Sequence, residues 1–316
     1  MIGTSKIFIV FATIFVVTAC GNETVIGEQE KEITPIVTAR RLDVITTIYP
    51  VTYFSERVGG DQVRVTSFAQ VGADPHSFDP SPSDIIKIGQ SDVLIYAHRD
   101  FEMWIPDAVD ASGNNSIVAL EASGLLGDFA VTRIEGDEPG GESDPHTWLN
   151  PLNAITMVRG IESVFVAADP SGADEFKQNA DRLEADLTLL DSQIAESIHN
   201  CSLDTVVVSH LAYGHMAERY GFTQLGLAGL SHGYEVSPNR VVSTVEEILE
   251  LGIKYIMQEP GGDGRLARMV AEQIGGSILE LHPLESLSAD DVLAGRDYMS
   301  IMRRNAQVLS QAMGCQ

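Results

Sequence analysis

The sequence predicts an α/β fold of two domains, each with a parallel sheet flanked by helices, joined by one long rigid helix. Short β-branched runs alternate with helical stretches in both halves of the chain, which is typical of parallel sheets covered on both faces. A segment without Gly or Pro, with apolar residues at helical spacing, lies between the halves. The length of 316 residues is sufficient for two ordinary domains.

Both halves show the same order of elements. In the first half we expect strands at 43–48, 63–68, 93–96 and 117–120, and helices near 51–58 and 82–90. In the second half we expect strands at 205–208, 222–225, 255–258 and 277–280, and helices near 213–220, 238–251, 266–274 and 289–313. Ser237-Pro238 indicates a helix start, because a capping hydroxyl precedes a proline at the first helical position.

The segment 173–199 predicts the joining helix. Its apolar residues recur at helical spacing, and they are Phe176, Leu183, Leu187, Leu190, Ile194 and Ile198. A single stiff helix between two domains limits hinge opening, whereas a flexible linker would permit it. The expected domains are therefore residues 42–171 and residues 200–316, with residues 172–199 as the linking helix.

The charge balance is strongly acidic. The chain has 45 Asp and Glu against 20 Lys and Arg, which gives a formal charge of −25. Proteins that bind nucleic acids need a basic face to neutralise phosphates, so this composition argues against that class. A soluble protein that meets cations fits the charge better. We separately expect the protein to be a monomer.

The first twenty residues resemble a secretory signal that ends in a bacterial lipobox. Lys6 precedes an apolar stretch over 7–17, which is shorter than the ~20 residues that a membrane-spanning helix needs. In a lipobox the cysteine, here Cys20, becomes the lipid-modified first residue of the mature protein. We expect a signal peptide at 1–19, a flexible tether at 20–41 and an exported protein held at the membrane surface. An uncleaved anchor helix is the alternative.

Four of the eight histidines lie where ligand-binding residues gather in α/β proteins. His76, His210 and His282 follow predicted strands, and ligands of such folds collect at the carboxyl ends of strands. His76 and His146 share the tripeptide Asp-Pro-His, which places an imidazole after a rigid proline. The aspartate of each tripeptide could orient the ring from behind. The pattern indicates a metal site, although no compact H-x-x-H or C-x-x-C motif occurs.

Five motifs follow one another in a fixed order along the chain. They are His76-Ser77-Phe78-Asp79-Pro80 with Phe101-Glu102-Met103-Trp104, Asp144-Pro145-His146-Thr147-Trp148, Ser209-His210-Leu211-Ala212-Tyr213-Gly214, Glu235-Val236-Ser237-Pro238 with Glu259-Pro260, and His282-Pro283-Leu284. Over about residues 42–313, this order resembles the zinc/manganese solute-binding proteins of bacterial ABC importers, the cluster A-I family. The resemblance implies a metal held between the two domains by His76, His146 and His210, with a fourth ligand at His282.

The ligand types predict which metal binds. Imidazole nitrogen suits Zn²⁺ whereas Mn²⁺ sites favour carboxylates, so Zn²⁺ is expected, with Mn²⁺ or Fe²⁺ as alternatives. In the family the fourth position is usually Asp, and here it is His282. If His282 is displaced, a water molecule or one of Glu280, Glu285 and Asp290 could complete the shell. Zinc members often carry a His-rich loop before the second ligand, whereas residues 133–144 are acidic and contain no His.

The resemblance implies an exported receptor, and not an enzyme, that captures Zn²⁺ and delivers it to an ABC permease with its ATPase. A zinc hydrolase is the competing class, since three His and a water form a catalytic site, but no H-E-x-x-H motif occurs. A surface adhesin on the same fold is a further alternative. Cys201 and Cys315 are left after lipidation, and in an exported protein a disulfide between them would tie the terminal helix to a strand.

Overall fold

The computed structural model describes residues 40–130, 144–227 and 238–316. The expected signal peptide at 1–19, Cys20 and the tether as far as residue 39 lie outside the described residues, as does almost all of the acidic segment 133–144. Residues Ala39–Gln316 form one compact unit. No helix in the described ranges has the length and apolar character that crossing a bilayer requires.

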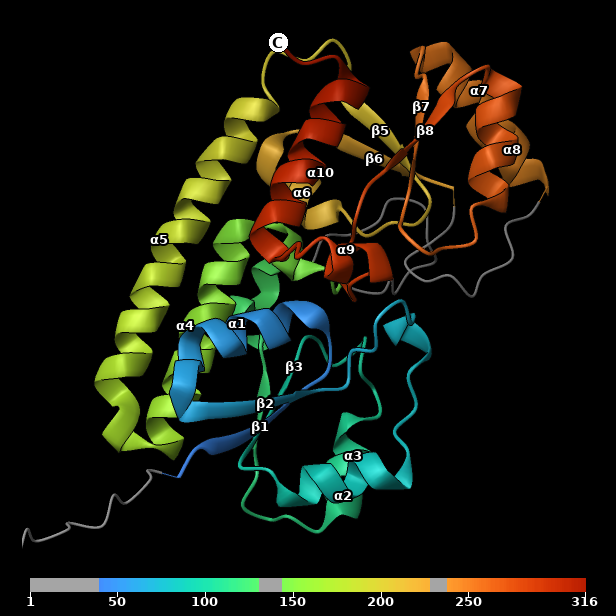
Figure 1. Cartoon of the computed structure of the whole chain (residues 1–316). Helices are drawn as coiled ribbons and strands as arrows, with labels where there is room; N and C mark the ends of the chain where they lie inside the picture. The colour runs from blue at the N-terminus through green and yellow to red at the C-terminus, as the bar shows by residue number, and fades with distance from the viewer. Residues whose placement is uncertain (1–39, 131–143, 228–237) are drawn as a thin grey trace, which may run out of the picture. The chain divides into compact units, whose positions relative to one another are not determined.

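The first sheet has four parallel strands in the order β2-β1-β3-β4. These strands are β1 (Leu42–Thr46), β2 (Val63–Ser67), β3 (Val93–Tyr96) and β4 (Val118–Glu121). Helices α1 (Tyr49–Gly59) and α4 (Pro151–Ala168) cover one face, and α2 (Pro82–Gln90) and α3 (Ile105–Ser112) cover the other (Figure 1). Because side chains alternate along a strand, Val93 and Ile95 pack with α1 and α4 while Leu94 packs with α2 and α3.

The second sheet repeats this connectivity, with four parallel strands in the order β6-β5-β7-β8. These strands are β5 (Thr205–Val208), β6 (Thr223–Gly226), β7 (Tyr255–Gln258) and β8 (Ser277–Glu280), and the helices are α6 (Gly214–Tyr220), α7 (Pro238–Leu251), α8 (Arg265–Ile274) and α10 (Tyr298–Met313). Val206 and Val208 face α6 and α10, whereas Val207 packs with α7 and α8. The predicted fold of two helix-flanked parallel sheets is confirmed.

One long helix, α5 (Ala173–Ser197), joins the two halves as predicted. Its 25 residues span about 37 Å at 1.5 Å per residue. It packs against α1 and α4 of the first half and against α10 of the second (Figure 1). Its buried residues, which include Phe176, Leu183 and Leu190, belong to a single hydrophobic core that also contains residues of both sheets.

The helices differ from the prediction in two places. Helices α3 and α4 have no counterpart among the predicted elements, and α4 contains an internal glycine. A Cβ at Gly160 would lie 2.1 Å from Cδ1 of Leu125, so a larger residue there would displace that half-exposed side chain. The closing helix expected at 289–313 is two helices, α9 (Ala289–Leu293) and α10. Gly295, at φ +62°, separates them, and Asp297 caps α10 by accepting the N–H of Ser300 at 2.8 Å.

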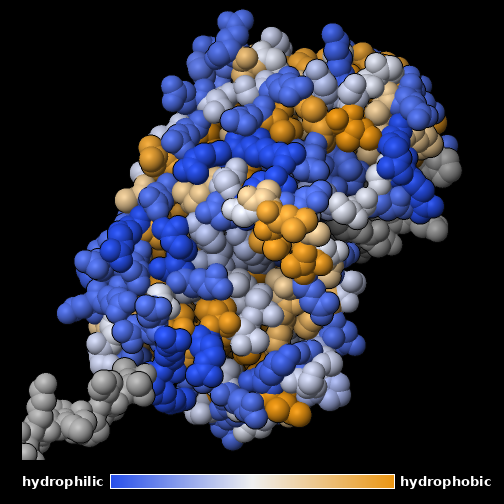
Figure 2. Space-filling model, viewed as in Figure 1, coloured by the Kyte–Doolittle hydropathy of each residue, from blue (hydrophilic) through white to orange (hydrophobic). Residues whose placement is uncertain are grey.

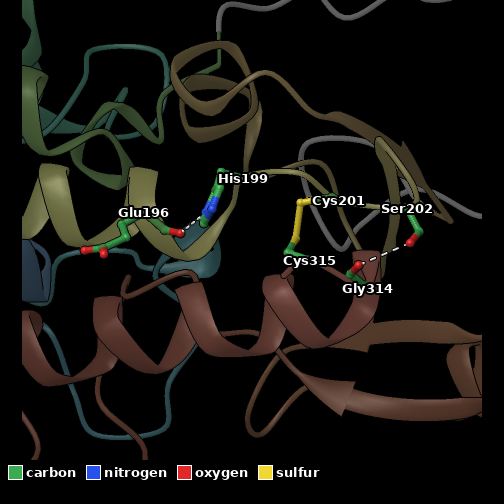
Figure 3. The surroundings of a disulfide bond; sticks show 6 residues. All are labelled: Glu196, His199, Cys201, Ser202, Gly314 and Cys315. Atoms are coloured by element: carbon green, nitrogen blue, oxygen red, sulfur yellow. Dashed lines mark hydrogen bonds between the residues drawn. A yellow bond between two sulfur atoms is a disulfide. The ribbon is translucent and has the colours of Figure 1, made fainter.

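A disulfide bond joins Cys201 to Cys315 (Figure 3). Beside it, the hydroxyl of Ser202 donates to the carbonyl of Gly314 at 3.2 Å, and the Ser202 N–H donates to the carbonyl of Met313 at 3.0 Å. The pairing of cysteines that the sequence allows is therefore present, and it ties the end of α10 to the segment that enters β5.

The surface in Figure 2 is mostly hydrophilic along α5, in keeping with the acidic composition. A hydrophobic patch lies on this face where Figure 1 places α9. Val292 and Leu293 of that helix are 51% and 85% exposed.

Candidate metal centre

Four side chains from distant parts of the sequence converge on one point. His76 lies in the short 3₁₀ turn Pro75–Ser77 after β2, and His146 directly precedes the turn Thr147–Leu149 that leads into α4. His210 follows β5, and Glu285 lies on the loop after β8. One ligand atom from each of the four lies within 4.8 Å of the others.

The carboxylate of Glu285 is the centre of the cluster. Its Oε1 atom lies 2.8 Å from Nε2 of His146, 3.2 Å from Nε2 of His76 and 3.6 Å from Nε2 of His210. A tetrahedral zinc ion with bonds of about 2.0–2.1 Å holds its ligand atoms about 3.4 Å apart. The separations from Oε1 lie on both sides of that value, and the donor atoms all lie within 4.8 Å of one another, so the side chains must move closer together to hold a tetrahedral ion.

The two Asp-Pro-His tripeptides form the same local turn. Oδ1 of Asp74 accepts the backbone N–H of His76 at 2.9 Å, and Oδ1 of Asp144 accepts the N–H of His146 at 2.9 Å. Oδ1 of Asp144 also lies 2.8 Å from Nδ1 of His146, so this aspartate orients the ring and leaves Nε2 toward the cluster. His215 Nε2 lies 2.9 Å from the carbonyl of Asp144 and supports the turn from the second half.

His210 is oriented by a carboxylate on the other side of its ring. Its Nδ1 lies 3.3 Å from Oε2 of Glu259, which follows β7, and both side chains are buried. Aromatic rings enclose the cluster on another side. The ring of Phe101 lies 4.4 Å from that of His76, and the ring of Trp148 lies 5.3 Å from that of His146, measured between centroids. The site is therefore largely shielded from water.

The electrostatics of the cluster favour a charged carboxylate among protonated imidazoles. Burial opposes the charge of Glu285, but the neighbouring imidazoles of His146, His210 and His76 outweigh it and hold the carboxyl pKa well below its usual value. Burial likewise opposes protonation of His210, yet Glu259 and Glu285 raise its pKa to about 10. Asp144 and Glu285 raise the pKa of His146 against the effect of burial. The protein without metal thus holds protons where a cation would bind.

The structure does not bring His282 into the cluster, which is a correction to the expected ligand set. Nδ1 of His282 accepts the N–H of Leu284 at 2.8 Å, and Nε2 lies 3.1 Å from Oδ2 of Asp291. One ring nitrogen therefore has its partner in the loop and the other in α9, and the fourth donor of the cluster is Glu285. Glu285 was one of three carboxylates that could replace His282, and nothing in its sequence context separated it from Glu280.

The chain is similar to known zinc-binding proteins. Residues 44–312 match the model of a family described as "Zinc-uptake complex component A periplasmic". The chain is 32% identical over 278 residues to the zinc-binding lipoprotein AdcA of Streptococcus pneumoniae, which covers 86% of this chain. The aligned region is 56% of that relative, so the chain spans little more than half the length of the curated relatives it first matches.

Two solved structures are similar over most of the chain. The Zn(II)-bound ZnuA-like domain of Streptococcus pneumoniae AdcA has a TM-score of 0.74 at 32% identity, covering 86% of this chain and 99% of that domain. The laminin-binding protein Lmb of Streptococcus agalactiae, described as having adhesin and metal transporting activity, has a TM-score of 0.77 at 27% identity. The matched region covers 87% of this chain and 100% of the Lmb chain.

Proposed function

The chain belongs to the family of zinc-uptake complex component A proteins, and we propose that it binds Zn²⁺ outside the cytoplasm and delivers it to an ABC-type importer. The convergence of His76, His146, His210 and Glu285 is the observation that carries this proposal. Three neutral imidazoles and one carboxylate would give the site a charge of −1, which offsets part of the ion's charge in a buried environment.

The donor set favours Zn²⁺ over Mn²⁺. Three of the four donors are imidazole nitrogens, which suit zinc, and only one is the carboxylate oxygen that manganese prefers. The name of the similar lipoprotein and the zinc-bound state of the similar domain support the same choice. We therefore assign Zn²⁺ as the cargo.

The same four donors favour binding over catalysis. A catalytic zinc site keeps one position open for water, whereas four protein ligands fill a tetrahedral shell. Glu285, the only carboxylate in the described cluster, is itself a donor, so it is not available as a base beside a bound water. A receptor that captures and releases an ion needs no such base.

The remaining parts of the proposal concern location and partners. The lipobox at Cys20 supports a lipid anchor on the outer face of the membrane, where a permease and its ATPase would receive the metal. We further propose that the two sheets mark two domains, residues 42–171 and 200–316, and that the receptor acts as a monomer. Replacing Cys20 with Ala should release the protein from the membrane fraction without changing its zinc affinity.

Elemental analysis followed by competitive titration tests the central proposal. The purified protein should hold one equivalent of zinc and should prefer Zn²⁺ when Zn²⁺ and Mn²⁺ are offered at equal concentration. A preference for manganese would overturn the choice of metal and leave the receptor class intact. Absence of binding to either ion would overturn the receptor itself.

Adhesion is a second candidate, because the similar Lmb structure is described as bifunctional. The assay is binding of the metal-free and zinc-loaded protein to immobilised laminin, with a chain carrying His146→Ala as a comparison. Saturable binding that the His146→Ala chain retains would support an adhesive surface separate from the metal site.

A further inference from the structure

We propose that His282 is a positioning residue whose imidazole holds the loop that presents Glu285 to the three histidines. This inference rests on the proposed zinc site and adds a residue to it that is not itself a ligand. The observations come from the loop between β8 and α9.

The side chain of His282 makes the same local hydrogen bond as an aspartate makes at two metal-site histidines. In Asp74-Pro75-His76 and Asp144-Pro145-His146, an aspartate oxygen accepts the N–H two residues on, at 2.9 Å in both cases. In His282-Pro283-Leu284, Nδ1 of the imidazole accepts the N–H two residues on, at 2.8 Å. The side chain of His282 therefore does with a ring nitrogen what an aspartate oxygen does elsewhere.

The contacts of His282 fix which nitrogen carries its proton. The N–H of Leu284 is a donor, so Nδ1 must be the unprotonated ring nitrogen. A neutral ring then carries its proton on Nε2. Nε2 faces Oδ2 of Asp291 at 3.1 Å, and Asp291 is held in turn by Nε of Arg296 at 2.6 Å. Burial lowers the pKa of His282, with Asp291 acting against it, which fits a neutral ring. The ring is thus held from both ends.

The turn that His282 closes is one that a leucine rarely adopts. Leu284 has φ +66°, in the left-handed region that favours glycine, and its side chain is fully buried. A strained backbone of this kind persists only when its surroundings fix it. The hydrogen bond from Leu284 to Nδ1 is formed inside the turn, and it holds the residue that directly precedes Glu285.

Contacts from other elements hold the backbone on both sides of this turn. Asn305 of α10 bonds both the N–H of His282, at 3.0 Å, and its carbonyl, at 2.7 Å. The indole of Trp148 donates to the carbonyl of Pro283 at 2.8 Å, and the N–H of Tyr49 donates to the carbonyl of Glu285 at 3.0 Å. The backbone is thereby anchored at its ends, and the imidazole sets the conformation between them.

Three substitutions at position 282 test this role. His282→Ala removes the acceptor, His282→Asn keeps an acceptor that reaches the N–H two residues on, and His282→Gln offers an amide too long for that turn. The readouts are zinc affinity by competition with a chelator, the visible spectrum of the Co²⁺-loaded protein and the melting temperature of the metal-free protein. The Co²⁺ spectrum reports the coordination of the ion, which loss of stability alone would not change.

We expect His282→Ala to weaken zinc binding by roughly 10–100-fold, the range typical of residues that orient metal ligands. Its Co²⁺ spectrum should shift toward that of Glu285→Gln, whereas His282→Asn should keep the parental spectrum and nearly the parental affinity. A core variant, Ile256→Val, controls for stability, because Ile256 is buried in β7 away from the cluster. If His282→Ala fails to fold, the zinc affinities and Co²⁺ spectra of His282→Asn and His282→Gln test the same role, because only the Asn side chain can accept the N–H of Leu284.

Parental affinity and spectrum in His282→Ala, or identical losses in Asn and Gln, would overturn the positioning role. Failure of the proposed function looks different, because the parent chain itself would then bind neither Zn²⁺ nor Co²⁺. A parent that binds, with Glu285→Gln impaired and His282→Ala unimpaired, would keep the zinc site and reject this inference alone.

Discussion

Oε1 of Glu285 lies 2.8 Å from Nε2 of His146, although 139 residues separate them in sequence. Both side chains are buried. The contact joins the turn before α4, in the half of the chain that holds the first sheet, to the loop after β8 of the second sheet. A buried carboxylate is costly unless a positive charge faces it. Protonated imidazole meets that need in the protein without metal, and a divalent cation would meet it in the loaded protein.

Replacing Glu285 with Gln should weaken zinc binding at least about 100-fold, or about 2.7 kcal/mol. The amide keeps the size of the side chain but removes the only negative charge among the four donors. Competition with a chromophoric chelator measures the change. Glu280→Gln is the matched control, because that carboxylate is half exposed and outside the cluster. Equal affinities in Glu285→Gln and Glu280→Gln would show that Glu285 is not a ligand.

Zinc binding should release protons at neutral pH. A zinc ligand must be an unprotonated imidazole, and the pKa of His210 is raised to about 10, so its proton must leave before the ion binds. For each proton displaced, affinity should rise tenfold per pH unit up to that pKa and fall as pH decreases. Calorimetry in buffers of different ionisation enthalpy measures the number of protons.

The same calorimetric titration of Glu285→Gln tests whether Glu285 is the reason that His210 holds its proton. Glu285 is one of the two carboxylates that raise the pKa of His210, so its loss should reduce the protons released. A heat of binding that does not depend on the buffer, in the parent chain, would contradict the ion-paired state of the metal-free site.

Zinc should stabilise the protein against heat, and the imidazoles should be required for it. At a thousandfold excess over its dissociation constant, an ion that binds only the folded state adds about 4 kcal/mol, or roughly 10 °C for a chain of this size. His76→Ala and His210→Ala should lose most of this shift. His199→Ala, an exposed histidine that is not in the described cluster, should keep it. A full shift in His76→Ala would rule that residue out as a ligand.

The fold could be predicted because its signals are local. Strand candidates such as 93–96 and 205–208 coincide with β3 and β5, since their β-branched runs are bounded by turns. The sequence predicts one closing helix where the structure has two, because the break between them depends on the backbone conformation of Gly295 and on the helix cap at Asp297. Helix α4 has no predicted counterpart, and its internal glycine lies against a leucine that is distant in sequence.

The site was partly predictable for a related reason. The place of His76 and His210 after strands and the Asp-Pro-His tripeptides of His76 and His146 indicated a metal site, and the family resemblance implied these three residues as ligands. The choice between His282 and Glu285 could not, because it depends on the direction in which the turn at Leu284 sends each side chain. That direction follows from contacts with Asn305 and Trp148, which are distant in sequence.

The disulfide between Cys201 and Cys315 should support stability without affecting the metal site. It closes a segment of 114 residues, and removing a crosslink over a loop of that length costs up to about 4–5 kcal/mol by the loss of chain constraint in the unfolded state. The bond ties the end of α10 to the entry of β5, and none of the four described donors lies beside it in sequence.

Cys201→Ser together with Cys315→Ser should therefore lower the free energy of unfolding, measured with denaturant under oxidising conditions, and leave zinc affinity within about twofold of the parent. The parent chain treated with a reductant serves as the comparison, since it loses the bond without a change in sequence. A tenfold loss of zinc affinity in the double variant, with its unfolding free energy unchanged, would show that α10 transmits strain to the loop of Glu285 and that the bond is part of the site.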